Sequence, residues 1–291
     1  MPTSEIKKLV APFGDSLLVV GAEGFVKGHI HTEEPEKLLA AVAKCGKMVR
    51  SKVEDMSEQH SEILMNVDVH AAKPPESALV VVGDGYGVTK VFRSLGARVV
   101  GGGQTNNPSV EDIADAVRSV AAARVIVMPN NKNIVMAAER VGELVGDKEV
   151  LVLPTRTLAQ GLAAAVRFDE RAAPQAQLAA LRAAAEHART LEVTTANRST
   201  TLDGMTVSEG EFIGLVDDRL ELAGATPEAV LLGLLARHAE GYEVGALFYS
   251  ASVGQDAAEA LSEEIAERFQ DLELELHAGG PDLYPYVLAL E

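Results

Sequence analysis

The sequence of 291 residues contains one cysteine, no tryptophan and few other aromatic residues. Because Cys45 has no second cysteine to pair with, an internal disulfide is excluded, which is typical of a reducing compartment. No apolar run approaches the length of a bilayer span, and the first residues, with Glu5 and Lys7, do not have the pattern of a signal peptide. The sequence therefore predicts a globular, cytoplasmic protein with no membrane span.

Basic residues are scarce toward the end of the chain. The formal net charge is −17, and residues 208–291 carry three arginines against 18 acidic residues. A nucleic-acid binder needs a basic patch that displaces counterions from phosphates, and an anionic membrane surface attracts the same kind of patch. No run dense in lysine and arginine is present, so both kinds of partner are excluded. A surface this acidic would instead attract the basic face of a protein partner.

The first part of the chain, residues 1–72, predicts a small α+β domain. A short helix begins after Ser4, a β-hairpin follows within residues 16–31, and a helix over residues 32–44 precedes a further strand. This order is that of a ferredoxin-like unit without its first strand. A sheet without that strand has an open edge, so we expect that sequence preceding Met1 has been lost.

A Pro-rich linker, residues 73–77, separates this domain from a larger one over residues 78–291. Short β-branched runs alternate there with helical stretches, a pattern that predicts parallel strands with crossover helices. These runs are residues 78–82, 97–100, 124–128 and 149–153. Alanine-rich helices, an apparent hairpin across residues 207–222 and further strands complete an α/β domain with a mainly parallel sheet.

Glycines and uncharged polar residues follow each of the four runs. In an open parallel sheet, ligands bind outside the carboxyl ends of the strands, so these loops predict a polar crevice for an anionic group or a surface for a partner. They can also be read as ordinary turn and cap residues, but four such loops at one sheet edge favour function. The candidate residues are Gly102, Gln104, Thr105, Asn106, Asn107, Asn130, Asn131, Lys132, Asn133, Thr155, Arg156 and Thr157.

None of these loops is a nucleotide-binding motif. The segment Gly83–Gly87 lacks the third glycine of a dinucleotide fingerprint, and no loop continues into Gly-Lys-Ser/Thr. No Ser/His/Asp array has the context of a nucleophile elbow either. We therefore expect no catalytic residue in this chain and no binding of ATP with magnesium.

His29 and His31 are two residues apart on a predicted strand, so both imidazoles face the same side and can share a cation. Zinc normally takes three or four ligands, and spacing does not show whether Cys45 or His60 lies nearby. On spacing alone, a metal site and a pair of half-exposed histidines both stay open.

Several long strings together resemble one family. The strings are Gly14–Val20, Val26–Thr32, Val53–His60, Gly101–Ser109, Met128–Ile134, Leu153–Thr157, Gln160–Ala163 and Gly279–Tyr286. They resemble the middle and C-terminal domains of the bacterial fatty acid kinase ATP-binding subunit, which contains a dihydroxyacetone-kinase-like domain. The resemblance extends from about Gly14 to Glu291.

The resemblance implies a DegV-like fold for the larger domain and the docking there of a DegV-type fatty-acid-binding protein. The fatty acid of that partner is phosphorylated to an acyl phosphate. For the small domain, the resemblance implies dimerisation and a zinc site in which His29 and His31 match the His-x-His pair of the family. Cys45 does not match the metal-site cysteine of the family, so this zinc site is expected to be incomplete.

The nucleotide domain of the family has no counterpart in this sequence. We therefore expect a region of a fatty acid kinase subunit that forms a homodimer, docks the fatty-acid-binding partner and is inactive alone. The alternative is a free-standing protein that binds a fatty acid or another small anion in the strand-end crevice. An independent hydrolase or transferase is the weakest reading, because no pair of nucleophile and base can be named.

Overall fold

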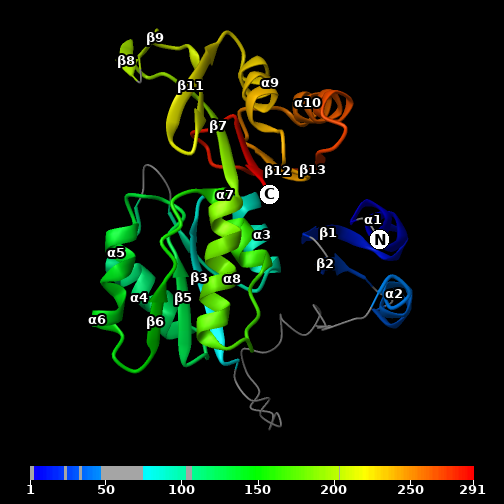
Figure 1. The fold of residues 1–291 in the computed structure, drawn as a ribbon, viewed down its shortest axis with the longest axis vertical. Coiled ribbons are helices and arrows are strands. Elements are labelled where there is room, and N and C mark those ends of the chain that lie inside the picture. The colour runs from blue at the N-terminus through cyan, green and yellow to red at the C-terminus, as the bar shows by residue number, and fades with distance from the viewer. Residues whose placement is uncertain (1–2, 23–24, 33–34, 47–74, 103–106, 203) are drawn as a thin grey trace. The chain divides into compact units, whose positions relative to one another are not determined.

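The computed structural model describes residues 3–22, 25–32, 35–46, 75–102, 107–202 and 204–291. The chain divides into two compact units, residues 1–74 and 75–291, and Figure 1 shows both. No described helix combines the length and the hydropathy that a membrane crossing requires. Each unit is described separately below.

The first unit contains an antiparallel hairpin and two short α-helices among its described residues. The elements are α1 (Thr3–Val10), the 3-10 helix η1 (Ala11–Phe13), β1 (Asp15–Ala22), β2 (Phe25–His31) and α2 (Pro35–Val42). This is the predicted order of helix, strand, strand and helix. Thr32, at the expected start of the second helix, donates its hydroxyl to the carbonyl of Phe13 at 2.6 Å. The strand expected to end near Val53 lies outside the described residues.

The second unit begins with a parallel sheet, as the β-branched runs predict. The described strands of this sheet lie in the order β4-β3-β5-β6 and are all parallel. We call residues 75–188 the parallel lobe. Its elements are β3 (Ser77–Gly83), α3 (Tyr86–Ser94), β4 (Arg98–Gly101), α4 (Val110–Ser119), β5 (Arg124–Met128), α5 (Val135–Glu139), α6 (Val141–Leu144), β6 (Glu149–Val152), α7 (Leu158–Val166) and α8 (Pro174–His187).

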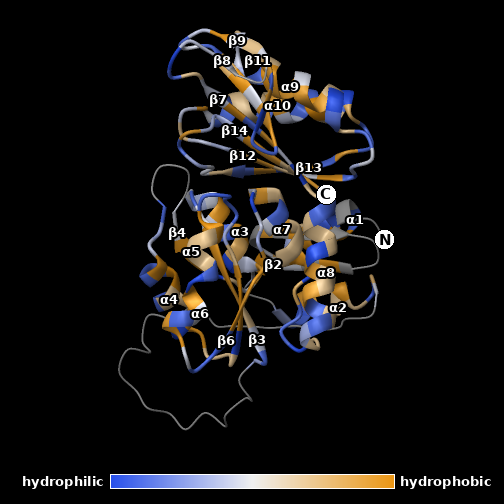
Figure 2. Ribbon diagram, turned by 60° about the vertical axis from the view of Figure 1, so that its left-hand side comes forward, coloured by the Kyte–Doolittle hydropathy of each residue, from blue (hydrophilic) through white to orange (hydrophobic). Residues whose placement is uncertain are grey.

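Helices cover both faces of this sheet, so its central strands are buried on both sides. Figure 2 shows those strands as hydrophobic, and the side chains of Leu79, Val80 and Val81 have no exposed surface. A strand buried on both faces reads as a continuous apolar run, which is why the sequence reveals it.

The rest of the unit, residues 189–291, forms a second sheet that the sequence pattern does not separate from the first. Its described strands lie in the order β11-β10-β7-β14-β12-β13, and only β12 and β13 pair in parallel. We call this part the mixed lobe. Its elements are β7 (Arg189–Thr195), β8 (Thr200–Leu202), β9 (Met205–Val207), β10 (Phe212–Val216), β11 (Arg219–Gly224), α9 (Pro227–His238), β12 (Val244–Tyr249), α10 (Gln255–Arg268), β13 (Glu273–Ala278) and β14 (Tyr286–Leu290).

The hairpin expected across residues 207–222 is formed by β10 and β11. Asp217 and Asp218 make its turn with φ of 47° and 70°, the left-handed conformation that a two-residue hairpin loop requires. Val207 belongs to β9, which pairs with β8 instead.

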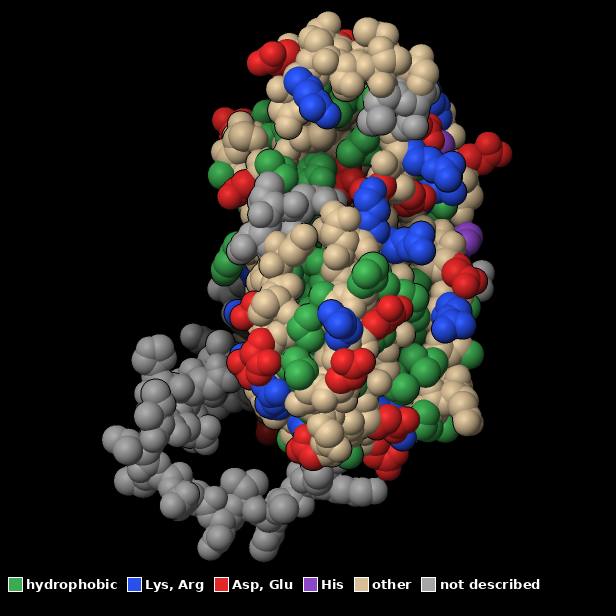
Figure 3. All heavy atoms as spheres, turned by 90° about the vertical axis from the view of Figure 1, so that its left-hand side faces the viewer, with side chains coloured by type: hydrophobic (Ala, Val, Ile, Leu, Met, Phe, Trp, Pro, Cys, Tyr) green, Lys and Arg blue, Asp and Glu red, His purple; other side chains and the backbone are tan. Residues whose placement is uncertain are grey.

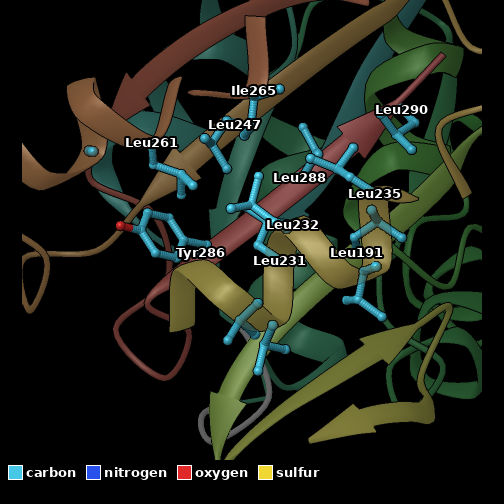
Figure 4. Packing of buried hydrophobic residues seen from close by; sticks show 14 of the residues in the cluster. Leu191, Leu231, Leu232, Leu235, Leu247, Leu261, Ile265, Tyr286, Leu288 and Leu290 are labelled. Atoms are coloured by element: carbon cyan, nitrogen blue, oxygen red, sulfur yellow. The ribbon is translucent and has the colours of Figure 1, made fainter. Parts of the chain in front are cut away.

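The core of the mixed lobe lies between its sheet and the helices α9 and α10 (Figure 4). Leu231 and Leu235 of α9 pack with Leu191 of β7 and Leu288 of β14, and each is at most 1% exposed. Tyr286 is also fully buried, and its hydroxyl donates to Glu228 at the start of α9 at 3.0 Å. This bond satisfies the one polar atom that the ring brings into the core.

The two lobes meet where the start of α3 approaches the loop after β13 (Figure 1). The N–H of Gly87 donates to the carbonyl of Gly279 at 2.7 Å. A Cβ at Gly87 would overlap the carbonyl of Ala278, and a Cβ at Gly85 would lie 2.7 Å from the carbonyl of Gly279. Only glycine allows backbones to approach this closely. The Gly-x-Gly segment after β3 therefore serves the joint between the lobes.

We predict that Gly87→Ala destabilises the protein by about 1–3 kcal/mol, because the added methyl group forces the two backbones apart. Gly101→Ala is the matched control, since no atom lies within 4 Å of a Cβ there, and its effect should stay within about 0.5 kcal/mol. Urea unfolding of both variants measures the difference. Equal midpoints for Gly87→Ala and the wild type would show that the joint tolerates a side chain.

Candidate functional site

The carboxyl ends of three neighbouring parallel strands open onto a small pocket, as the strand-end rule predicts. Gly83 and Asp84 follow β3, Gly102 follows β4, and Asn130 and Asn131 follow β5. The mixed lobe closes the pocket. Its lining residues from that lobe are Glu192, Pro281, Leu283, Tyr284 and Val287.

The loop after β4 is only partly described. Gly102 is buried and its N–H donates to the carbonyl of Gly83 at 3.3 Å. Asn107 is exposed, and the hydroxyl of Ser109 caps α4 in a reciprocal pair with Asp112. The other candidates of this loop, Gln104, Thr105 and Asn106, lie outside the described residues.

The side chain of Asn130 ties three parts of the parallel lobe together. Its amide donates to the carbonyl of Val82 at 2.9 Å, and its oxygen accepts from the hydroxyl of buried Thr155 at 2.7 Å. Asn130 has φ of 54°, and a Cβ at Gly161 of α7 would overlap its side chain. The polar groups of Asn130 and Thr155 are thus engaged within the protein and fix the ends of β3, β5 and β6.

The remaining polar candidates also make local bonds. The side-chain oxygen of Asn131 accepts from the N–H of Asn133 at 2.8 Å. Thr157 caps α7, and the N–H of Arg156 donates to the side chain of Gln160 at 2.7 Å. These bonds match the turn-and-cap reading that the sequence left open. Binding of a ligand or partner by these residues stays a prediction.

Lys132 links the two lobes by charge. Its ammonium lies 3.1 Å from the carboxylate of Asp218 in the β10–β11 turn. The neighbouring Asp217 accepts from the N–H of Thr190 at 3.0 Å. Figure 3 shows basic side chains next to acidic ones at the level where the lobes meet. The side chains of Lys132 and Asp218 therefore join the sheet edge to the mixed lobe.

Glu192 of β7 is the functional candidate that the sequence reading missed. Burial raises the pKa of its carboxyl to about 7, with the carboxylates of Asp218 and Asp217 contributing in the same direction and Lys132 in the opposite one. The signal was present in the sequence, because Glu192 is a lone acid between Leu191 and Val193 of a buried strand.

The lining and the size of the pocket limit what it can hold. Asp84 and Glu192 both line it, and its described lining contains no lysine or arginine. The cavity has a volume of about 60 Å³, whereas sites for small organic ligands typically have about 300–1,000 Å³. Among the described residues, the pocket therefore suits water better than an anion or an acyl chain.

The first unit contains the predicted zinc ligands. His29 and His31 occupy positions on β2 opposite Leu18 and Asp15 of β1, respectively. The structure describes these histidines by their backbone, and His60 lies outside the described residues. Cys45 follows α2, with its sulfur 3.8 Å from the carbonyl of Ala41. Among the described side chains, no group of three His, Cys, Asp or Glu is placed to hold a metal, so the zinc prediction rests on the sequence.

We predict that Glu192→Gln changes how stability depends on pH. Between about pH 4.5 and 7 the folded wild type holds a proton on Glu192 that the unfolded chain has lost, so its stability falls as the pH rises. The Gln variant lacks this decline and should be more stable than the wild type at pH 8, by on the order of 1–2 kcal/mol.

Urea unfolding at pH 5 and pH 8 measures this effect. Glu139→Gln, an exposed acid on α5, is the matched control and should follow the wild type at both values. Parallel pH curves for the wild type and Glu192→Gln would contradict the prediction.

Comparison with known families matches both parts of the chain. The model of the FakA-like C-terminal domain of fatty acid kinases matches residues 78–291, and that of the FakA-like middle domain matches residues 1–63. A Staphylococcus aureus (strain USA300) protein is 34% identical over 297 residues, which cover 99% of this chain and 53% of that protein. The chain thus spans about half of the length of the relatives that it matches.

Solved structures similar to this chain share its fold. DegV, a fatty acid binding protein from Bacillus subtilis, has a TM-score of 0.53 at 12% identity, with 74% of this chain and 99% of that chain covered. The dihydroxyacetone kinase of C. freundii has a TM-score of 0.50 at 14% identity, with 75% of this chain and 48% of that chain covered.

At these identities the similarity concerns the fold alone, and it confirms the expected DegV-like α/β fold. The matches to the middle and C-terminal domains confirm the resemblance that the sequence strings carry. With both of these domains represented along its length, the chain belongs to the FakA-like family of fatty acid kinases.

Proposed function

We propose that this chain is the part of a fatty acid kinase subunit that dimerises and docks a DegV-type fatty-acid-binding partner. The fatty acid carried by the partner would be phosphorylated to an acyl phosphate by a nucleotide-binding domain outside residues 1–291. The family membership of residues 1–63 and 78–291 supports the kinase-related role.

The small acidic pocket is the observation that carries the docking role. The second unit has a DegV-like fold, yet its strand-end cavity has only about 60 Å³ and includes the carboxyls of Asp84 and Glu192. Leu158 and Leu283 also line this cavity. A fatty acid would need several times this volume and would bring its carboxylate next to two acidic groups. This favours a protein that receives a loaded partner over one that holds the acid itself.

Surface charge supports a basic partner. The outward residues of α10 are mostly acidic and exposed, and its last turn pairs Arg268 with Glu264 at 3.0 Å. Its exposed acids are Asp256, Glu259, Glu263, Glu264 and Glu267. Such a field speeds association with a positively charged protein face and slows association with nucleotides or free fatty acids.

The second candidate function is a free-standing fatty-acid or anion binder. The likeness to DegV of B. subtilis, a fatty acid binding protein, favours it. Organic extraction of the purified chain followed by mass spectrometry separates the two functions. A docking region releases no acyl ligand, whereas a binder releases one in stoichiometric amount.

We predict that the chain associates with the DegV-type fatty-acid-binding protein from the same organism, and that titration calorimetry detects the complex at micromolar concentration. The dissociation constant should rise when salt increases from about 50 to about 500 mM, because screening weakens the attraction between acidic and basic faces. No association at high micromolar concentration would contradict the docking role. An affinity independent of salt would contradict its electrostatic part.

We also predict that the first unit binds zinc through His29 and His31. Metal analysis after incubation with zinc and gel filtration should find bound zinc that His29→Ala removes. His187→Ala is the matched control, because His187 lies on α8 of the other unit beside Tyr242. A wild-type chain that retains no zinc after this treatment would contradict the prediction.

A further inference from the structure

Two large apolar side chains stand exposed beside the pocket. Tyr86, the first residue of α3, is 77% exposed, and Leu283, in the loop after β13, is 44% exposed. The rest of the apolar face of α3 is buried, including Val88, Val91 and Phe92. Tyr86 thus belongs to a helix that buries its other large apolar residues and is itself turned to solvent, which is unusual for an aromatic residue.

The two side chains belong to one surface. Leu283 and Asp84 line the same pocket, and Tyr86 lies two residues after Asp84. The Cβ of Tyr86 would be 3.3 Å from a Cβ placed on Gly279, in the loop that leads to Leu283. We call Asp84, Tyr86, Asp282 and Leu283 the docking rim.

The backbone under the docking rim is held firmly. The N–H of Gly87 donates to the carbonyl of Gly279 at 2.7 Å, and the carbonyl of Leu283 accepts from the hydroxyl of Thr194 at 2.8 Å. The residue after Leu283 is also fixed, since Tyr284 donates its N–H to the carbonyl of Pro281 at 3.1 Å and is itself buried. Exposed apolar groups on a fixed backbone lose little entropy on binding, which is the property of a binding hot spot.

Charge indicates what covers the docking rim. Asp84 and Asp282 are both exposed and flank the apolar pair. A second copy of this chain would bring like charges together at this surface, since the chain carries a net charge of −17. A partner with an apolar recess bordered by lysine and arginine matches the rim in both respects.

We infer that the fatty-acid-binding partner docks on this rim, with Tyr86 as the anchor that enters an apolar recess between basic side chains of the partner. The inference rests on the proposed function and adds to it the surface and the chemistry of the contact.

Titration of the full chain with the DegV-type partner from the same organism tests the inference. Tyr86→Ala should weaken the affinity by roughly 10- to 100-fold, and Tyr86→Phe should restore most of it, because an anchor acts mainly through its ring. Met136→Ala is the matched control: Met136 is 76% exposed on α5 of the same lobe, and its variant should bind within about twofold of the wild type. Circular dichroism and thermal unfolding of each variant check that the fold is retained.

The outcomes separate the two proposals. If the wild type binds the partner and Tyr86→Ala binds equally well, the inference is overturned and the docking function stands. If the wild type does not bind, both are overturned. If Tyr86→Ala abolishes self-association in sedimentation velocity and leaves partner binding intact, a second copy covers the rim and the inference is wrong.

Discussion

The backbone contact between Gly87 and Gly279 is the constraint on which the second unit depends. It joins the start of α3 in the parallel lobe to the loop after β13 in the mixed lobe, at a distance that no side chain at Gly85 or Gly87 would permit. A second bond between the lobes runs from the N–H of Ala159 to the hydroxyl of Thr190 at 3.2 Å. The joint closes the pocket from one side and fixes Tyr86 beside its mouth.

The joint also changes the chemistry of the strand ends. In a doubly wound sheet, helix N-termini and glycine loops at this edge usually receive a ligand. Here the N–H of Gly87 is taken by the protein, Asn130 and Thr155 hold each other, and Lys132 pairs with Asp218. The edge that binds ligands in related architectures is thereby converted into a rigid support, and exposed apolar surface lies beside the pocket, at Tyr86 and Leu283.

Local signals in the sequence identify most single elements. The continuous apolar run of β3 marks a strand buried on both faces, and Thr226 followed by Pro227 marks the start of α9, where the threonine hydroxyl accepts from the N–H of Ala229 at 3.2 Å. Such signals depend on neighbours within a few residues. The separate sheet of the mixed lobe was not evident, because β7 pairs with β14, a strand at the far end of the chain.

By itself, the sequence determined the family, the parallel sheet and the set of polar residues at its carboxyl edge, because these follow from motif strings and short-range patterns. Only the tertiary structure decided what those residues do. Hydrogen bonds and ion pairs between distant positions, such as Lys132 with Asp218, take up their polar groups. Likewise, the raised pKa of Glu192 arises from burial and from the carboxylates of a turn that is distant in sequence, a proximity that no local pattern encodes.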